Sequence, residues 1–179
     1  MLDPVFALLL RCSLALLFGA AAFHKLRAPR AFAETLGDYA LLPIALVPWV
    51  AAALGAGELL LVIGLLVPVA VAAAALGGAG LLGVYSGAIA INLARGRRDI
   101  DCGCLGPAGR QPLSARLLVR NVLLIAACLA LLAPVGARAL FWVDALSVAG
   151  GSAAFALLWS AVQRIQLSAP GLADPGRSS

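Results

Sequence analysis

The chain has 179 residues, of which 63% are hydrophobic and 12% are charged, with a formal net charge of +5 at pH 7. A soluble domain is about half apolar and roughly a quarter charged. This chain has more apolar surface than the interior of a soluble domain of its size could bury, so a water-soluble fold is excluded. Disordered chains are also excluded, because they are rich in charge and poor in apolar residues. The composition indicates an integral membrane protein, and we expect no nucleic-acid partner.

Apolar runs predict five membrane-spanning helices, since one span needs about 20 apolar residues. The predicted spans are approximately 5–23, 44–66, 69–93, 117–132 and 141–162. The expected fold class is therefore all-α, a four-helix transmembrane bundle with a fifth, C-terminal span. Only the junction Val67-Pro68 separates the second span from the third, so we expect a tight helical hairpin there.

The domain organisation follows from these runs. Residues 1–134 form the predicted bundle, 135–163 carry the additional helix, and 164–179 are a polar, proline- and glycine-containing tail that we predict to be disordered. A cleaved signal peptide is the alternative for the first run, but such peptides carry positive charge ahead of the apolar stretch. Here Asp3 is the only charge ahead of it and Arg11 lies inside it, so we interpret the segment as a retained span.

Two segments between spans are long enough to hold chemistry. In residues 24–43, Phe32, Leu36 and Tyr39 recur at helical spacing between charged residues, which predicts a short amphipathic helix at the headgroup boundary. The second segment, 94–114, contains four arginines, two aspartates and several glycines. With five spans, both segments fall on the same side of the membrane.

The second segment contains the sharpest motif, Cys102-Gly103-Cys104. Two residues of chain span at most about 6.6–7.2 Å, and disulfide Cα separations reach about 6.8 Å, so a bridge within the motif requires a bent chain, which Gly103 permits. Strained, exposed disulfides are the labile and catalytic ones. Cations stabilise the reactive thiolate, and the motif is flanked by Arg98 and Arg110, with Asp101 beside it.

Other interpretations of the pair are a structural bridge, a metal site, and an accident of composition without a role. Asp99, Asp101 and His24 could add ligands to the cysteines, but the sequence offers no second Cys/His pair, and we assign no metal ligands. Cys12 and Cys128 lie in apolar runs, where cysteine usually packs as a small hydrophobe.

Glu58 is the second informative residue, because it lies well inside the second span. A charged group there costs at least about 2.5–3.5 kcal/mol and normally faces a partner inside the bundle. The candidate partners are Arg120 and Asn121, or Lys25 or His24 if the first span is tilted. Glu58 is then either a proton acceptor or quinone-side group coupled to thiol chemistry, or a structural clamp between helices.

Three further positions need a polar environment. Asn92 closes the third span next to the cysteine segment and is expected to cap it or to hydrogen-bond to it. The Tyr85 hydroxyl lies deep enough to need a partner. Trp159 lies near a span end and is predicted to be an interfacial anchor.

The order of these motifs resembles the methylamine utilisation protein MauE family, within the wider DoxX-like group of small membrane bundles. The resemblance covers roughly residues 5–134, and Cys-Gly-Cys followed by an apolar residue and glycine is its most specific part, with Leu105 where phenylalanine is more usual. The motifs, in chain order, are Phe23-His24-Lys25, Tyr39-Ala40-Leu41-Leu42-Pro43, Gly57-Glu58, Asn92-Leu93-Ala94-Arg95-Gly96, Asp101-Cys102-Gly103-Cys104-Leu105-Gly106 and Arg120-Asn121.

The resemblance implies a role in maturing an exported protein that contains disulfides, with a thioredoxin-like protein as partner. In methylamine utilisation that client is the small subunit of methylamine dehydrogenase. The bundle also resembles vitamin K epoxide reductase, which implies a quinone as electron partner. However, residues 24–43 contain no cysteine, so a relay would have to use a partner's thiols.

Two arguments about orientation disagree. Lys and Arg mark the cytoplasmic side, and most of them share the side of the cysteines, whereas Arg138 stands in a loop on the other. Disulfides persist outside the cytoplasm, so maturation of an exported client places the cysteines there. We adopt the exoplasmic side of a bacterial inner membrane.

The hypothesis from the sequence is a membrane thiol–disulfide carrier in which Cys102 and Cys104 exchange with a thioredoxin-like partner while Glu58 and Arg120 order the bundle. The alternatives are a non-catalytic membrane scaffold that docks a redox enzyme, as DoxX-type proteins do, and a metal-delivery protein.

Overall fold

The computed structural model describes residues 1–97, 100–101 and 113–168, and in these ranges the chain is helical apart from its connections. Its helices are α1 (Pro4–Arg27), α2 (Pro29–Asp38), α3 (Val47–Leu66), α4 (Val71–Ala94), α5 (Ala115–Ala130) and α6 (Trp142–Ser168). Short 3-10 turns, η1 (Ile44–Leu46) and η2 (Pro68–Ala70), lead into α3 and α4. The all-α membrane fold is confirmed.

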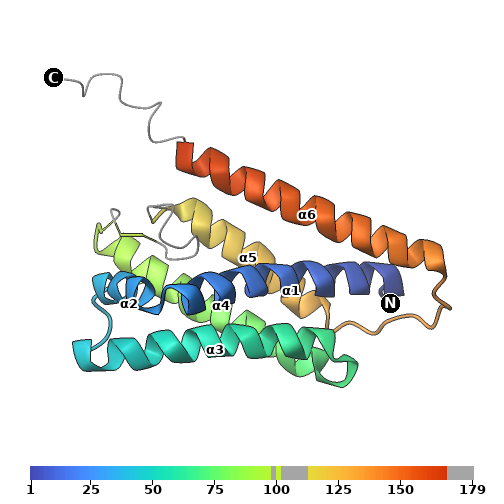
Figure 1. The fold of residues 1–179 in the computed structure, drawn as a ribbon, viewed down its shortest axis with the longest axis horizontal. Helices are drawn as coiled ribbons and strands as arrows, with labels where there is room; N and C mark the ends of the chain where they lie inside the picture. The colour runs from blue at the N-terminus through green and yellow to red at the C-terminus, as the bar shows by residue number, and fades with distance from the viewer. Residues whose placement is uncertain (98–99, 102–112, 169–179) are drawn as a thin grey trace.

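The long helices α1, α3, α4 and α5 pack side by side as a bundle, and α6 lies along the outside of α1 (Figure 1). Among the described residues, four helical segments are long and apolar enough to cross a membrane: Pro4–Arg27, Ile44–Leu66, Pro68–Ala94 and Trp142–Val162. The fourth predicted span, 117–132, corresponds to α5 (Ala115–Ala130), which has the predicted length. Helix α5 has 16 residues, about 24 Å at 1.5 Å per residue, against a hydrocarbon core of about 30 Å.

The ends of the helices follow from local sequence. Asp3 caps α1, because its Oδ1 accepts a hydrogen bond of 2.8 Å from the Val5 amide, and Pro4 follows at the first helical position. The residue before a proline is biased away from helical geometry, so α1 and α2 separate at Ala28-Pro29. The predicted Val67-Pro68 hairpin joins α3 to α4 in the same way.

Arg11, a charged residue inside the first span, finds its hydrogen-bond partners at the C-terminal end of α3. The Arg11 guanidinium donates to the Leu65 carbonyl oxygen at 2.9 Å and to the Leu66 carbonyl oxygen at 3.3 Å. These carbonyls lie in the last turn of α3, where helical partners are missing and positive charge is favourable. Arg11 therefore ties α1 to the α3–α4 hairpin.

The core lies between α1, α3, α4 and α5. Phe18 of α1 is almost completely buried there, and Cys128 of α5, predicted to be a packing residue, is 1% exposed. Many large apolar side chains on the outer faces stay exposed, as expected for a lipid-facing surface. The core cluster comprises Leu14, Ala15, Phe18, Leu65, Ala74, Ala75, Leu82, Leu124, Cys128 and Leu131.

The C-terminal helix is longer than the sequence predicted. Helix α6 continues past the predicted end of its span to Ser168, and residues 169–179, most of the predicted tail, lie outside the described residues. At the other end, Leu2 exchanges backbone hydrogen bonds of 2.9 Å with Pro134 and Gly136. The N-terminus is thereby held against the connection between α5 and α6.

Candidate functional site

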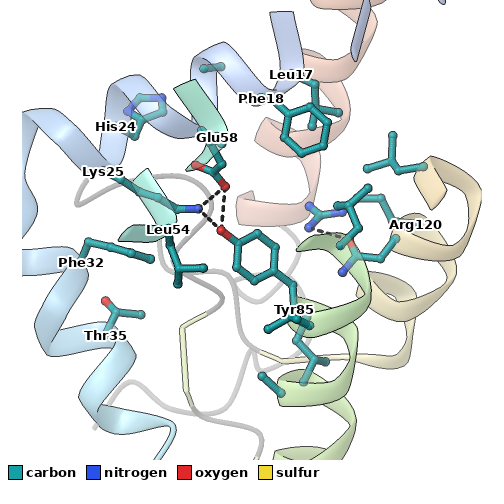
Figure 2. Close-up of a pocket in the computed structure, with 18 of the residues that line it drawn as sticks. Leu17, Phe18, His24, Lys25, Phe32, Thr35, Leu54, Glu58, Tyr85 and Arg120 are labelled. Carbon is teal, nitrogen blue, oxygen red and sulfur yellow. Dashed lines mark hydrogen bonds and ion pairs between the residues drawn. The ribbon is translucent and has the colours of Figure 1, made fainter. Parts of the chain in front are cut away.

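A cluster of polar side chains lies inside the bundle, where α1, α3 and α4 meet (Figure 2). Lys25, in the last turn of α1, is 5% exposed, and Glu58 of α3 is 1% exposed. Lys25 Nζ forms an ion pair with Glu58 Oε1 and donates a second hydrogen bond to the Tyr85 hydroxyl at 2.8 Å. The Tyr85 hydroxyl in turn donates to Glu58 Oε1 at 2.8 Å. The two opposite charges and the hydroxyl form a closed triangle.

Aromatic rings complete the surroundings of the Lys25 ammonium group. Nζ lies 4.9 Å from the ring centroid of Phe32 and 4.6 Å from that of Tyr85, within the range of cation–π attraction. Phe32 belongs to α2, the predicted amphipathic helix. The break at Ala28-Pro29 folds α2 back, and its apolar side therefore covers the charged cluster.

Lys25 is the partner of Glu58 among the candidates that the sequence suggested. Arg120 and Asn121 lie farther along, on α5, where Arg120 Nη2 donates to Asn121 Oδ1 at 3.5 Å. The Arg120 guanidinium lies 5.6 Å from the ring centroid of Trp159. Trp159, predicted to be an interfacial anchor, is half-buried against this arginine and links α6 to α5.

Ile100 and Leu113, which lie on either side of the cysteine-containing segment, are packed against the bundle. The Leu113 amide donates to the Ile100 carbonyl oxygen at 3.2 Å, and both side chains are buried in one cluster with Tyr39 and Leu117. Tyr39 follows α2, so the two predicted polar segments lie at the same end of the molecule, as expected (Figure 1).

Asn92 and Arg97 strengthen this junction. Asn92 is fully buried, and its backbone carbonyl accepts from the Arg97 amide at 3.0 Å. Arg97 Nη1 also donates to Asn92 Oδ1 and to the Tyr39 carbonyl oxygen, both at 3.4 Å. Asn92 therefore hydrogen-bonds to the segment that follows it, as the sequence predicted.

Several predicted site residues lie outside the described residues, namely Arg98, Cys102, Gly103, Cys104 and Arg110. Asp101 is described and is half-buried. The remaining two cysteines lie in helices α1 and α5. Cys128 is in the core, and Cys12 is half-buried in α1.

The polar cluster opens onto a cavity of about 790 Å³. Its walls come from α1, α2, α3, α4, α5 and α6, and they are mostly apolar. Neither this cavity nor the ring contacts of Phe32 and Trp159 could be predicted from the sequence. The ring contacts of Phe32 and Trp159 depend on how α1, α2, α5 and α6 are placed, and periodicity along one helix carries no signal of that placement.

Comparison with known proteins identifies the family to which the chain is similar. The family described as methylamine utilisation protein MauE matches residues 3–134, which include α1 to α5. Proteins named methylamine utilization protein MauE are similar to the chain: that of Paracoccus denitrificans is 44% identical over 138 residues, 73% of this chain and 70% of the relative. That of Paracoccus versutus is 38% identical over 127 residues, 71% of this chain and 68% of the relative. That of Methylophilus methylotrophus is 42% identical over 112 residues, which are 63% of this chain and 57% of the relative. No solved structure matches significantly.

Proposed function

The chain belongs to the MauE family of methylamine utilisation proteins, and from this premise we propose that it is a membrane thiol–disulfide carrier that supports maturation of an exported protein. In this proposal Cys102 and Cys104 exchange disulfides with a thioredoxin-like partner. The client is an exported protein with disulfides, and in methylamine utilisation it is the small subunit of methylamine dehydrogenase.

The observation that carries the proposal is the anchoring of the cysteine segment at its two ends. The twelve residues 101–112 begin and end at the hydrogen bond between Leu113 and Ile100. This junction is packed at one end of the bundle, beside the residues that follow α2. The residues that flank the motif are therefore fixed at one end of the bundle.

Charge near the motif supports thiol chemistry. Arg95, Arg97 and Arg98 precede the pair in sequence, and Arg110 follows it. Positive charge favours the thiolate, which is the form that attacks a disulfide. Asn92, which is buried and hydrogen-bonded to Arg97, stabilises this end of the bundle.

The exchange conserves bonds and electrons. The thiolate of one cysteine attacks the partner's disulfide, and a mixed disulfide forms while one partner thiolate leaves. The second cysteine then attacks the mixed disulfide, which leaves a Cys102–Cys104 disulfide and a partner with two thiols. Two electrons have moved to the partner, and the reverse sequence moves two electrons from it.

The test is complementation in Paracoccus denitrificans that lacks its own MauE. The Cys102→Ser/Cys104→Ser double variant is expected to abolish maturation of methylamine dehydrogenase, measured as growth on methylamine and as enzyme activity in extracts. The single Cys104→Ser variant is expected to accumulate a mixed disulfide with a thioredoxin-like protein, seen on non-reducing gels.

The matched control is Cys12→Ser, which removes a half-buried thiol of α1 and should leave maturation unchanged. Full maturation by the stably expressed double variant would contradict the carrier function. That result would favour a membrane scaffold that acts without its cysteines.

A further inference from the structure

The cavity beside Glu58 combines an apolar wall with an unusual concentration of aromatic rings. Six of the chain's eleven aromatic residues line it. They come from α1, α2, α4 and α6 and from the residue that follows α2. The six are Phe18, Phe32, Tyr39, Tyr85, Phe155 and Trp159.

The cavity can be reached from the lipid phase. Among its lining residues, Leu16 is 48% exposed, Val84 is 63% exposed and Ile91 is 44% exposed, on faces of helices that cross the membrane. A molecule that dissolves in the bilayer can therefore enter from the side, with its apolar part remaining in contact with lipid.

The polar cluster at the wall of this cavity has unused hydrogen-bonding capacity. Within the described part of the chain, no group donates to Glu58 Oε2, although this oxygen is buried. Lys25 Nζ has three N–H groups, and two of them are engaged by Glu58 Oε1 and the Tyr85 hydroxyl. Because the charges of Lys25 and Glu58 cancel, the missing group is a neutral one that donates to the carboxylate and accepts from the ammonium.

A hydroxyl on an aromatic ring has these properties. Its O–H donates and its oxygen accepts, while the ring can stack or pack edge-on against Phe32 and Tyr85. An alkyl tail suits the apolar, lipid-facing side of the cavity. We propose that this cavity binds a lipid-soluble hydroxylated aromatic molecule of the alkyl quinol class, with a ring hydroxyl on the Glu58–Lys25 pair. The inference concerns binding and does not depend on the thiol function.

The experiment measures binding of decylbenzoquinol to the purified full chain in detergent under anaerobic conditions. In a Trp49→Phe/Trp142→Phe background, Trp159 of the cavity wall is the only tryptophan left. Titration should quench its fluorescence with a saturable midpoint. The dimethyl ether of the same quinol keeps the ring and tail but has no donor, and it should bind at least roughly tenfold more weakly.

Variants test the position of the ring hydroxyl. Tyr85→Phe removes one corner of the triangle, and Glu58→Gln removes the carboxylate charge; each should weaken binding roughly fivefold to tenfold. Ser86→Ala is the matched control, because the Ser86 hydroxyl bonds to the Leu82 carbonyl oxygen of its own helix at 2.7 Å. The Cys102→Ser/Cys104→Ser variant should bind the quinol normally, which separates this test from that of the carrier function.

Three results would overturn the inference. Equal affinity for the quinol and its dimethyl ether would mean that the cavity holds only an acyl chain. Equal affinity for dioctanoylglycerol, which has a hydroxyl but no ring, would identify a hydroxylated lipid as the occupant. Unchanged binding in Tyr85→Phe and Glu58→Gln would place the quinol elsewhere. The comparison of ligands uses the unaltered cluster, so it holds even if a variant fails to fold.

Discussion

The ion pair of Lys25 and Glu58 shows what a single charge requires inside a membrane bundle. A lone carboxylate at the centre of a span costs at least about 2.5–3.5 kcal/mol. Here the ammonium group and the Tyr85 hydroxyl both contact Glu58 Oε1, so the charge is compensated by two helices at once. The pair therefore couples the positions of α1, α3 and α4.

Removing one partner should be worse than removing both. Lys25→Met leaves Glu58 buried without its counter-charge, and we expect a loss of about 3–5 kcal/mol in the free energy of unfolding. In Lys25→Met/Glu58→Gln neither charge remains, so the loss should be clearly smaller. The measurement is denaturant or thermal unfolding in detergent, followed by circular dichroism. A double variant as unstable as the single one would show that the charges do not act as a pair.

The need for a partner at Glu58 could be predicted from the sequence, but the choice of Lys25 could not. Lys25 lies in the last turn of α1, whereas Glu58 lies well inside α3. They meet because the two helices are offset along their axes, and this offset is set by packing. The contact between Arg120 and Trp159 joins residues from α5 and α6 and was missed for the same reason.

At the scale of helices, apolar run length and proline position carried most of the prediction. The break at Pro68 is a local effect of the proline ring, so the α3–α4 hairpin could be located from the sequence, whereas α1 continues past its predicted end at residue 23 to Arg27. The shortest apolar run, 117–132, also predicted that α5 would be the shortest of the long helices.

Close packing of the α3–α4 hairpin depends on Gly64. A Cβ atom added there would lie 2.9 Å from the Ala74 Cβ atom, so Gly64→Ala should push the helices apart and destabilise the protein by about 1–3 kcal/mol. Gly57→Ala in the same helix is the control, because an added Cβ there meets nothing within 4 Å. Thermal unfolding midpoints in detergent compare the two. Equal midpoints for the two variants would contradict the role of Gly64 in the hairpin.

For the whole molecule, the positions of the basic residues at the two ends of the bundle bear on which side of the membrane the cysteine segment faces. Lys25 is buried in an ion pair, so it does not present its charge to lipid headgroups as the positive-inside rule assumes. At the opposite end, Arg138 lies 3.1 Å from Asp144 and 3.4 Å from Asp3. Arg27, Arg30 and Arg95 still lie at the end that carries the cysteine segment, so charge alone keeps favouring a cytoplasmic location for the cysteines, against the proposed function.

Labelling with a membrane-impermeant maleimide separates the two orientations. We expect Cys102 and Cys104 to react in intact cells whose outer membrane has been permeabilised, because an exported client requires them on the exoplasmic side. The Cys102→Ser/Cys104→Ser variant reports any residual reaction of Cys12 and Cys128. Ala137→Cys in that background is exposed in the connection between α5 and α6, at the other end of the bundle. It should react only after the inner membrane is opened. The reverse pattern would place the motif in the cytoplasm, where the carrier could exchange only with cytoplasmic thiols and could not act directly on an exported client.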